Sequence, residues 1–130
     1  MILDSSALVA ILRDEPEAAQ FAAAIAAAPR VAMSAASYLE TAIVIDRGRD
    51  PAQSRKFDAF LTANAIAVEP FTPAQAKLAR EAYRDFGKGS GHKAALNFGD
   101  CFSYALAADS RLPLLYKGED FAHAGLARAG

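Results

Sequence analysis

The chain has 130 residues, of which 53 % are hydrophobic and 22 % are charged, with a formal net charge of −1 and a single cysteine. This length and composition exclude a disordered chain and fit one domain, residues 1–130, with its own core. The near-neutral charge argues against nucleic-acid binding by bulk electrostatics. One cysteine excludes an internal disulfide, and no apolar run reaches the roughly 20 residues of a membrane span. We therefore expect a cytoplasmic protein that does not enter the membrane.

The first half of the chain predicts two short strands, each followed by two helices. We expect strands at residues 1–3 and 30–35, and helices at residues 7–15, 16–28, 37–48 and 52–65. Ser5 or Ser6 can cap the first helix, and Pro16 suits the first turn of the second. In the helix after the second strand, we expect Ile43 and Val44 to face inward.

The second half predicts a strand, two helices and a last strand. We expect strands at residues 66–71 and 112–116, helices at 72–87 and 97–109, and a flexible glycine-rich loop at 88–93. Strands separated by helices require crossover connections, which produce a parallel sheet with helices on its faces. The sequence therefore predicts an α/β fold with three layers, α/β/α, around a central parallel sheet of four to five strands.

Four acidic residues lie where such a fold places its ligand sites. Asp4 directly follows the first strand, Glu40 is expected in the first turn of the helix after the second strand, and Asp100 in the first turn of the helix before the fourth strand. Asp120 follows the fourth strand. In an open parallel sheet, ligands bind at the carboxyl ends of the strands. These four carboxylates could therefore converge on one edge.

Each acid also has a local explanation that requires no function. Ser37 and Glu40 have the S-x-x-E spacing of a capping box, and Asn97 and Asp100 are arranged in a similar way. Asp4 could cap its own helix, and acids in a first turn are favoured by the helix dipole. Taken singly, none of these positions demands a catalytic role.

Taken together, the acids indicate a cation site. Clustered carboxylates repel one another and lose hydration, and oxygen ligands favour Mg²⁺ or Mn²⁺. No zinc spacing is present, because Cys101 stands alone and His92 and His123 are far apart. An acid-only site fits metal-assisted phosphoryl chemistry. We interpret Cys101 as a small core residue, and Phe98 and Phe102 as neighbours in the core.

Four segments of the chain resemble the PIN-domain ribonucleases, in particular the VapC toxins of type II toxin–antitoxin pairs. They are "MILDSSALVAIL", "SAASYLETAIV", "LNFGDCFSYALA" and "PLLYKGEDF", in the family's order and over nearly the whole chain. The resemblance implies an α/β/α sandwich, a Mg²⁺ or Mn²⁺ site made of acids, and endoribonuclease activity.

The resemblance also implies roles for individual residues. Asp4, Glu40 and Asp100 look like the three core acids, and Asp120 looks like the fourth, so all four are expected to be catalytic and to bind metal. Ser6 is similar to the small polar residue that supports the first aspartate or its water.

The segment after Asp120 departs from the family pattern. Where relatives often carry a further acid, this chain continues as "AHAGLARAG". Glu119 and Asp120 are therefore the last acids available, and the sequence does not decide which of the two points inward.

The resemblance further implies an RNA substrate, a VapB-like antitoxin and a homodimer. A basic segment is the predicted rim of the RNA groove, and it comprises Arg84, Lys88, His92 and Lys93. Apolar helices could supply a dimer face or an antitoxin groove, or could simply belong to the core.

Two other interpretations stay open. A receiver-like or phosphatase-like domain would use an aspartate after the first strand and a lysine after a late strand, for which Lys117 is available. That scheme needs paired acids, whereas "LDSS" has one, and it gives Asp100 no role. A catalytically silent PIN-like module that binds protein or RNA is the other alternative, and it would be indifferent to metal.

Overall fold

The computed structural model describes all 130 residues and has the predicted order of strands and helices. The strands are β1 (Ile2–Leu3), β2 (Ala32–Ser34), β3 (Ala67–Glu69) and β4 (Leu114–Leu115). The helices are α1 (Ser5–Leu12), α2 (Ala18–Ala27), α3 (Ala35–Asp46), α4 (Pro51–Ala63), α5 (Pro73–Phe86), α6 (Phe98–Ser110) and the 3₁₀ helix η1 (Asp120–His123). None of these helices combines the length and the apolar character that crossing a membrane requires.

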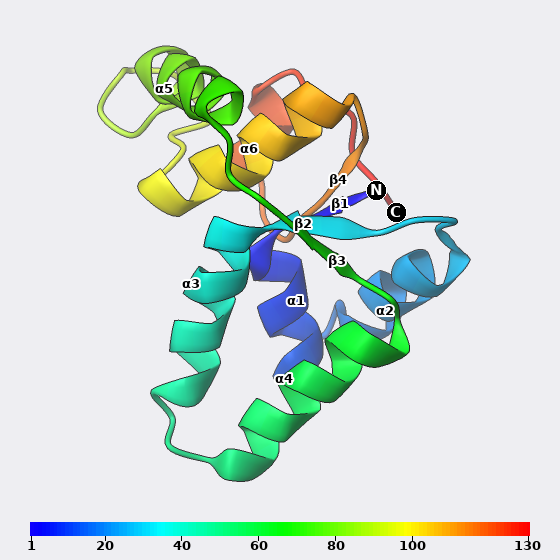
Figure 1. Ribbon diagram of the computed structural model, residues 1–130. Helices are drawn as coiled ribbons and strands as arrows, with labels where there is room; N and C mark the ends of the chain where they lie inside the picture. Colours follow the sequence, from blue (N-terminus) through cyan, green and yellow to red (C-terminus); the bar gives the residue numbers. More distant parts are fainter.

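The four strands form one parallel sheet in the order β3-β2-β1-β4 (Figure 1). Since all the strands are parallel, their carboxyl ends lie at the same edge of the sheet. β1 and β2 are the two central strands, so the residues that follow them lie in the middle of that edge. The predicted parallel sheet of four to five strands is confirmed.

Helices cover both faces of the sheet (Figure 1). α5 and α6 lie on one face, and α1 to α4 lie on the other. Side chains alternate between these faces along each strand: Ile2 and Leu114 join the core beneath α5 and α6, whereas Leu3 and Leu115 join the core beneath the other helices. The three-layer α/β/α architecture is therefore confirmed.

Two predicted helix starts are corrected. Asp4 caps α1, rather than Ser5 or Ser6, because its carboxylate accepts a hydrogen bond from the backbone N–H of Ser6. β2 runs into α3 without a loop, so Ser34 is the cap of α3 and Ser37 lies inside the helix, fully buried. Glu40 therefore lies in the second turn, not the first, and the predicted capping box is wrong.

Two predicted core positions are also wrong. Ile43 is 53 % exposed and Phe98 is 76 % exposed. The buried face of α3 is instead formed by Ser37, Thr41 and Ile45, which lie four residues apart and so share one side of the helix. Phe98 is the first residue of α6 and lies outside the core, where its ring packs edge-on against the partly buried ring of Phe102, at 4.9 Å between ring centroids.

Candidate metal-binding and catalytic site

The four predicted acids line one cavity of about 490 Å³ at the carboxyl edge of the sheet. Asp4 follows β1, Glu40 lies on α3, Asp100 lies on α6 and Asp120 begins η1 after β4. The structure thus brings together residues from four separate parts of the chain. Asp120 lines the cavity and Glu119 does not, which answers the choice that the sequence left open.

Asp4 is the most buried of these acids, with 2 % of its surface exposed. Its Oδ2 accepts hydrogen bonds from the backbone N–H of Ser6 at 3.0 Å and from the Ser6 hydroxyl at 2.5 Å, and its Oδ1 accepts one from the Ser103 hydroxyl at 2.5 Å. Ser6 Oγ in turn accepts a hydrogen bond from the Lys117 backbone N–H at 3.0 Å. Ser6 therefore holds the carboxylate and also links it to the segment after β4.

Glu40 approaches the backbone of α6 closely. Its Oε1 accepts a hydrogen bond from the Ser5 hydroxyl at 2.7 Å. A Cβ atom on Gly99 would lie 2.8 Å from Glu40 Cδ and 2.9 Å from Oε1, and would collide with Oε2. Only glycine leaves room for this carboxylate. The sequence analysis missed Gly99, although a glycine in the first turns of a helix lowers helix propensity by about 1 kcal/mol and so requires a reason.

Asp100 caps the start of α6 with one carboxylate oxygen and leaves the other without a hydrogen bond. Its Oδ2 accepts a hydrogen bond from the Asn97 backbone N–H at 2.9 Å, and Asn97 Oδ1 accepts one from the Asp100 backbone N–H at 2.9 Å. The predicted capping arrangement is therefore present. The other carboxylate oxygen, Oδ1, has no hydrogen-bond partner in the protein, so capping does not use the whole carboxylate.

The pKa of Asp100 shows that the acids act on one another. Burial raises this pKa most strongly, the hydrogen bond from Asn97 lowers it, and the negative charges of the other three acids raise it further, to about 7. No cationic side chain is close enough to lower this pKa, so the effects of burial and of the neighbouring acids are not offset.

Two buried serines, one on the helix of Glu40 and one on the helix of Asp100, form a hydrogen bond with each other. The hydroxyls of Ser37 and Ser103 lie 3.0 Å apart, and both residues are fully buried. Ser37 precedes Glu40 by three residues and Ser103 follows Asp100 by three, so each serine lies on the same helix face as its acid. The sequence analysis missed both serines, and this spacing was the signal that could have identified them.

Cys101 is buried, as predicted, and its thiol donates a weak hydrogen bond to the Asn97 carbonyl at 3.4 Å. Burial, together with the charge of Asp100, raises the pKa of the thiol to about 11. A thiol that stays protonated is a poor nucleophile and a poor metal ligand, so the chemistry of this site rests on oxygen atoms.

The donor set fits a hard divalent cation. Besides Oδ1 of Asp100, Oε2 of Glu40 and both oxygens of Asp120 accept no hydrogen bond from the protein. No three acidic, histidine or cysteine side chains are close enough to form a finished metal site. Carboxylate oxygens of this kind are the ligands that hard divalent cations prefer.

Lys117 lines the cavity, but its ammonium is paired with acids other than the four. Its ammonium is 2.7 Å from Glu15 Oε1 and 3.0 Å from Glu17 Oε2. The hydrogen bonds that the ammonium donates to these two carboxylates raise the pKa of Lys117. The lysine therefore binds the turn between α1 and α2 and does not approach the four acids, which leaves the receiver-like scheme without its cation.

The predicted RNA rim lies away from this cavity. None of its four residues, Arg84, Lys88, His92 and Lys93, lines the cavity. The Arg84 guanidinium is bound to Asp85 at 2.9 Å, and the His92 ring packs edge-on against Phe86, with 4.8 Å between ring centroids. These contacts account for both residues without RNA.

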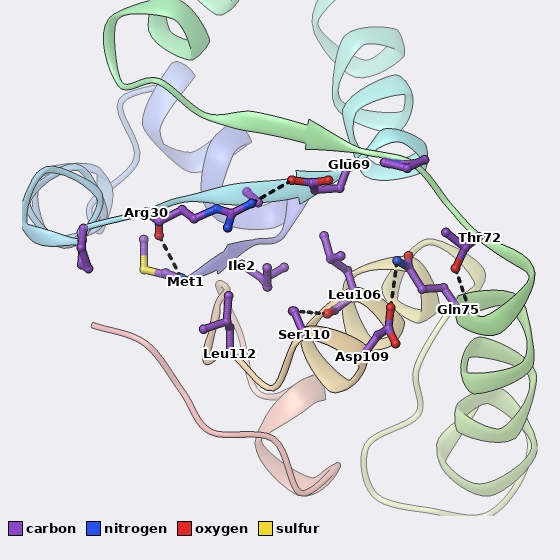
Figure 2. Close-up of a pocket in the computed structure, with 13 residues that line it drawn as sticks. Met1, Ile2, Arg30, Glu69, Thr72, Gln75, Leu106, Asp109, Ser110 and Leu112 are labelled. Atoms are coloured by element: carbon purple, nitrogen blue, oxygen red, sulfur yellow. Dashed lines mark hydrogen bonds and ion pairs between the residues drawn. The ribbon is translucent and has the colours of Figure 1, made fainter.

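A second and larger cavity, of about 580 Å³, contains none of the four acids (Figure 2). The Met1 ammonium donates a hydrogen bond to the Arg30 carbonyl at 2.9 Å, and the Arg30 guanidinium lies 3.3 Å from Glu69. The Gln75 side-chain amide donates a hydrogen bond to Asp109 at 3.3 Å. Each charged group that lines this cavity thus has a partner within the protein, although only Arg30 and Glu69 form an ion pair.

The PIN domain family model matches residues 1–126 of the chain. The chain belongs to the PIN-domain family. It is 59 % identical over 129 residues to ribonuclease VapC28 of Mycobacterium tuberculosis, covering 99 % of this chain and 97 % of that protein. It is 52 % identical over 121 residues to ribonuclease VapC of Mycolicibacterium smegmatis, covering 93 % of both chains. The family predicted from the four sequence segments is confirmed.

Solved structures share the fold of this PIN domain at low sequence identity. VapC20 of Mycobacterium tuberculosis, a toxin that cleaves the sarcin–ricin loop, superposes with a TM-score of 0.74 at 19 % identity, covering 97 % of this chain and 95 % of that chain. VapBC2 of Rickettsia felis, bound to a DNA fragment of its promoter, gives 0.75 at 15 % identity, covering 98 % and 94 %. At these identities the likeness concerns the fold alone.

Proposed function

We propose that this PIN domain is a Mg²⁺- or Mn²⁺-dependent endoribonuclease, the toxin of a VapBC-type toxin–antitoxin pair. It hydrolyses phosphodiester bonds of RNA. The observation that carries the proposal is the convergence of four carboxylates on one cavity, where none of the four forms an ion pair with a cationic side chain. The VapC relatives, which are ribonucleases by name and match over nearly the whole chain, support the same reaction.

A divalent cation bound there would supply the positive charge that activates water and stabilises the developing charge on the phosphate. Asp4 and Asp100 are the residues that hold it, because both are fixed by hydrogen bonds and keep acceptor capacity on Oδ1. Glu40, held by Ser5 against Gly99, contributes a ligand or orients the attacking water. Asp120, which also lines the cavity, would complete the set of acidic ligands.

The decisive experiment is cleavage of total bacterial RNA by the purified chain with Mg²⁺, with Mn²⁺ and with EDTA. We expect discrete fragments that require metal and disappear in Asp100→Asn. That substitution keeps the cap, because the Asn side-chain oxygen can still accept the hydrogen bond from Asn97. Asp58→Asn, on the exposed face of α4, is the matched control and should cleave normally. Absence of cleavage by folded, antitoxin-free protein would favour the catalytically silent module.

An exposed apolar patch beside the acids supports the proposed protein partners. Leu39, Ile43 and Phe98 are 58 %, 53 % and 76 % exposed, and they line a hollow that also includes Glu40. Apolar side chains gathered in this way mark interaction surfaces. We propose that the patch serves the homodimer or the VapB-like antitoxin.

Experiments can distinguish which of the two partners binds the patch. Phe98→Ser should weaken the homodimer in sedimentation velocity or weaken antitoxin binding in calorimetry, whereas Leu112→Ser, at 36 % exposure elsewhere on the surface, should do neither. If Phe98→Ser leaves both complexes intact, the patch does not serve a partner.

A further inference from the structure

α1 and α3 form two walls of the cavity that holds the acids. They begin at the carboxyl ends of the neighbouring strands β1 and β2, pack against each other and run away from the sheet (Figure 1). Residues three, four or seven positions apart share a helix face. Three such residues from each helix line the cavity: Ser6, Val9 and Arg13 from α1, and Glu40, Val44 and Arg47 from α3.

The cavity therefore has an acidic end and a basic end. Arg13 follows Ser6 by seven residues, and Arg47 follows Glu40 by seven, which corresponds to about 10 Å along each helix. Both arginines are exposed and stand at the C-terminal caps of their helices. The basic end is thus formed by matching positions on two helices that diverge from the same edge of the sheet.

The two arginines are free to bind a ligand. Three cationic residues line the cavity, and Lys117 among them is paired with Glu15 and Glu17. Arg13 and Arg47 form no ion pair and donate no side-chain hydrogen bond within the protein. Glu15, the fifth acid that lines the cavity, is already bound to Lys117 and is paired with neither arginine.

A single RNA strand needs a positively charged region in order to bind next to the acids. Its phosphates are repelled by four carboxylates, and a chain with a net charge of −1 offers little general attraction. Guanidinium groups bind phosphate oxygens through two parallel hydrogen bonds and keep their charge at every working pH.

We propose that Arg13 and Arg47 bind phosphates of the RNA strand that flank the bond to be cut, and so fix its register over the acids. This inference rests on the proposed ribonuclease function and assigns its backbone-binding subsite. The arginines are positioning residues, because the structure places them away from the reacting atoms.

The test is steady-state cleavage of a fluorescent single-stranded RNA by the full chain at several salt concentrations. We expect Arg13→Gln and Arg47→Gln each to raise KM about five- to tenfold and to change kcat less than twofold. Each substitution should also reduce the salt dependence of kcat/KM by about 0.7 in the log–log slope, as expected for one lost phosphate contact on a single strand. Arg55→Gln, an exposed arginine on α4 outside the cavity, is the matched control, and Lys88→Gln tests the basic segment predicted from sequence.

The outcomes separate this inference from the proposed function. If the wild-type chain cleaves RNA and both arginine variants behave like Arg55→Gln, the inference is wrong and the function stands. A fall in kcat at unchanged KM would also overturn it, and so would weaker antitoxin binding with normal RNA kinetics, which would assign the arginines to the protein partner. If the wild-type chain neither cleaves nor binds RNA, both the function and the inference fail.

Discussion

The two cavities of the molecule differ in how their charges are balanced. The larger one, at about 580 Å³, matches the Met1 ammonium and Arg30 with Glu69 and a backbone carbonyl, and its Asp109 accepts a hydrogen bond from Gln75. The smaller one, at about 490 Å³, gathers four carboxylates at one end and keeps its two unpaired arginines at the other. Size alone would select the larger cavity as the active site.

The comparison teaches that uncompensated charge is the better indicator of function here. Matched charges lower the electrostatic free energy of the folded chain and require nothing further. Carboxylates that raise one another's pKa raise that free energy, and a protein keeps such an arrangement where a ligand will offset it. The predictions below test this contrast by changing the same kind of group in each cavity.

The largest expected effect is on catalysis. Asp4→Asn should reduce RNA cleavage by about 10³-fold or more, because it removes a charge from the centre of the acid cluster. Asp109→Asn, in the larger cavity, should cleave RNA at the wild-type rate. Initial cleavage rates with saturating Mn²⁺ measure both, and circular dichroism checks that the two variants are folded. Equal losses in the two variants would contradict the contrast between the cavities.

A smaller loss is expected when the support of an acid is disturbed. Gly99→Ala places a methyl group against the Glu40 carboxylate and should displace it, at a cost of about 10- to 100-fold in cleavage rate. If Gly99 acts through Glu40, adding Gly99→Ala to Glu40→Gln should cost much less than in the wild-type chain. Additive losses in this double-mutant cycle would show that Gly99 serves the helix and not the acid.

The charge imbalance should also make stability depend on pH when metal is removed. The pKa of Asp100 is 3.8 as a reference and about 7 in the folded chain, so the folded state binds more protons between these values. The free energy of unfolding therefore falls as pH rises from about 4 to about 7. After allowance for solvent screening, the loss is on the order of 1–2 kcal/mol.

Asp100→Asn should lack this decline, because its side chain does not titrate. Chemical denaturation in EDTA at pH 5 and pH 8 compares the two proteins, and their difference isolates Asp100 from the other titrating groups. Mg²⁺ at pH 8 should stabilise the wild-type chain more than the variant. Parallel pH dependence in the two proteins would show that the acids do not interact as the structure indicates.

The fold and the acids could be predicted because both depend on local patterns in the chain. Short apolar runs separated by helices define a parallel sheet, and acids placed after the strands must meet at one edge of it. Asp4, Glu40, Asp100 and Asp120 could thus be identified without knowing any contact. The sequence segments of the PIN-domain family led to the same four residues.

The rest depends on contacts between distant parts of the chain. Gly99 is required only because the Glu40 carboxylate lies against it, and the sequence does not show that the Ser103 hydroxyl lies 2.5 Å from Asp4 Oδ1. The exposure of Phe98 could not be predicted for a similar reason, because an apolar residue looks the same in the sequence whether the core or a partner covers it. The basic segment with Arg84 does not line the acid cavity, and its role as a rim of the RNA groove stays a prediction.

The smallest expected effect comes from the larger cavity, where Glu69→Gln removes the ion pair with Arg30. The two side chains are 33 % and 74 % exposed and 3.3 Å apart, so water already screens most of their attraction. The free energy of unfolding should fall by less than about 1 kcal/mol, and RNA cleavage should not change. Urea denaturation measures the first quantity and initial rates the second. A marked loss of cleavage in Glu69→Gln would mean that a matched cavity can also serve the reaction, and charge imbalance would then no longer distinguish the two.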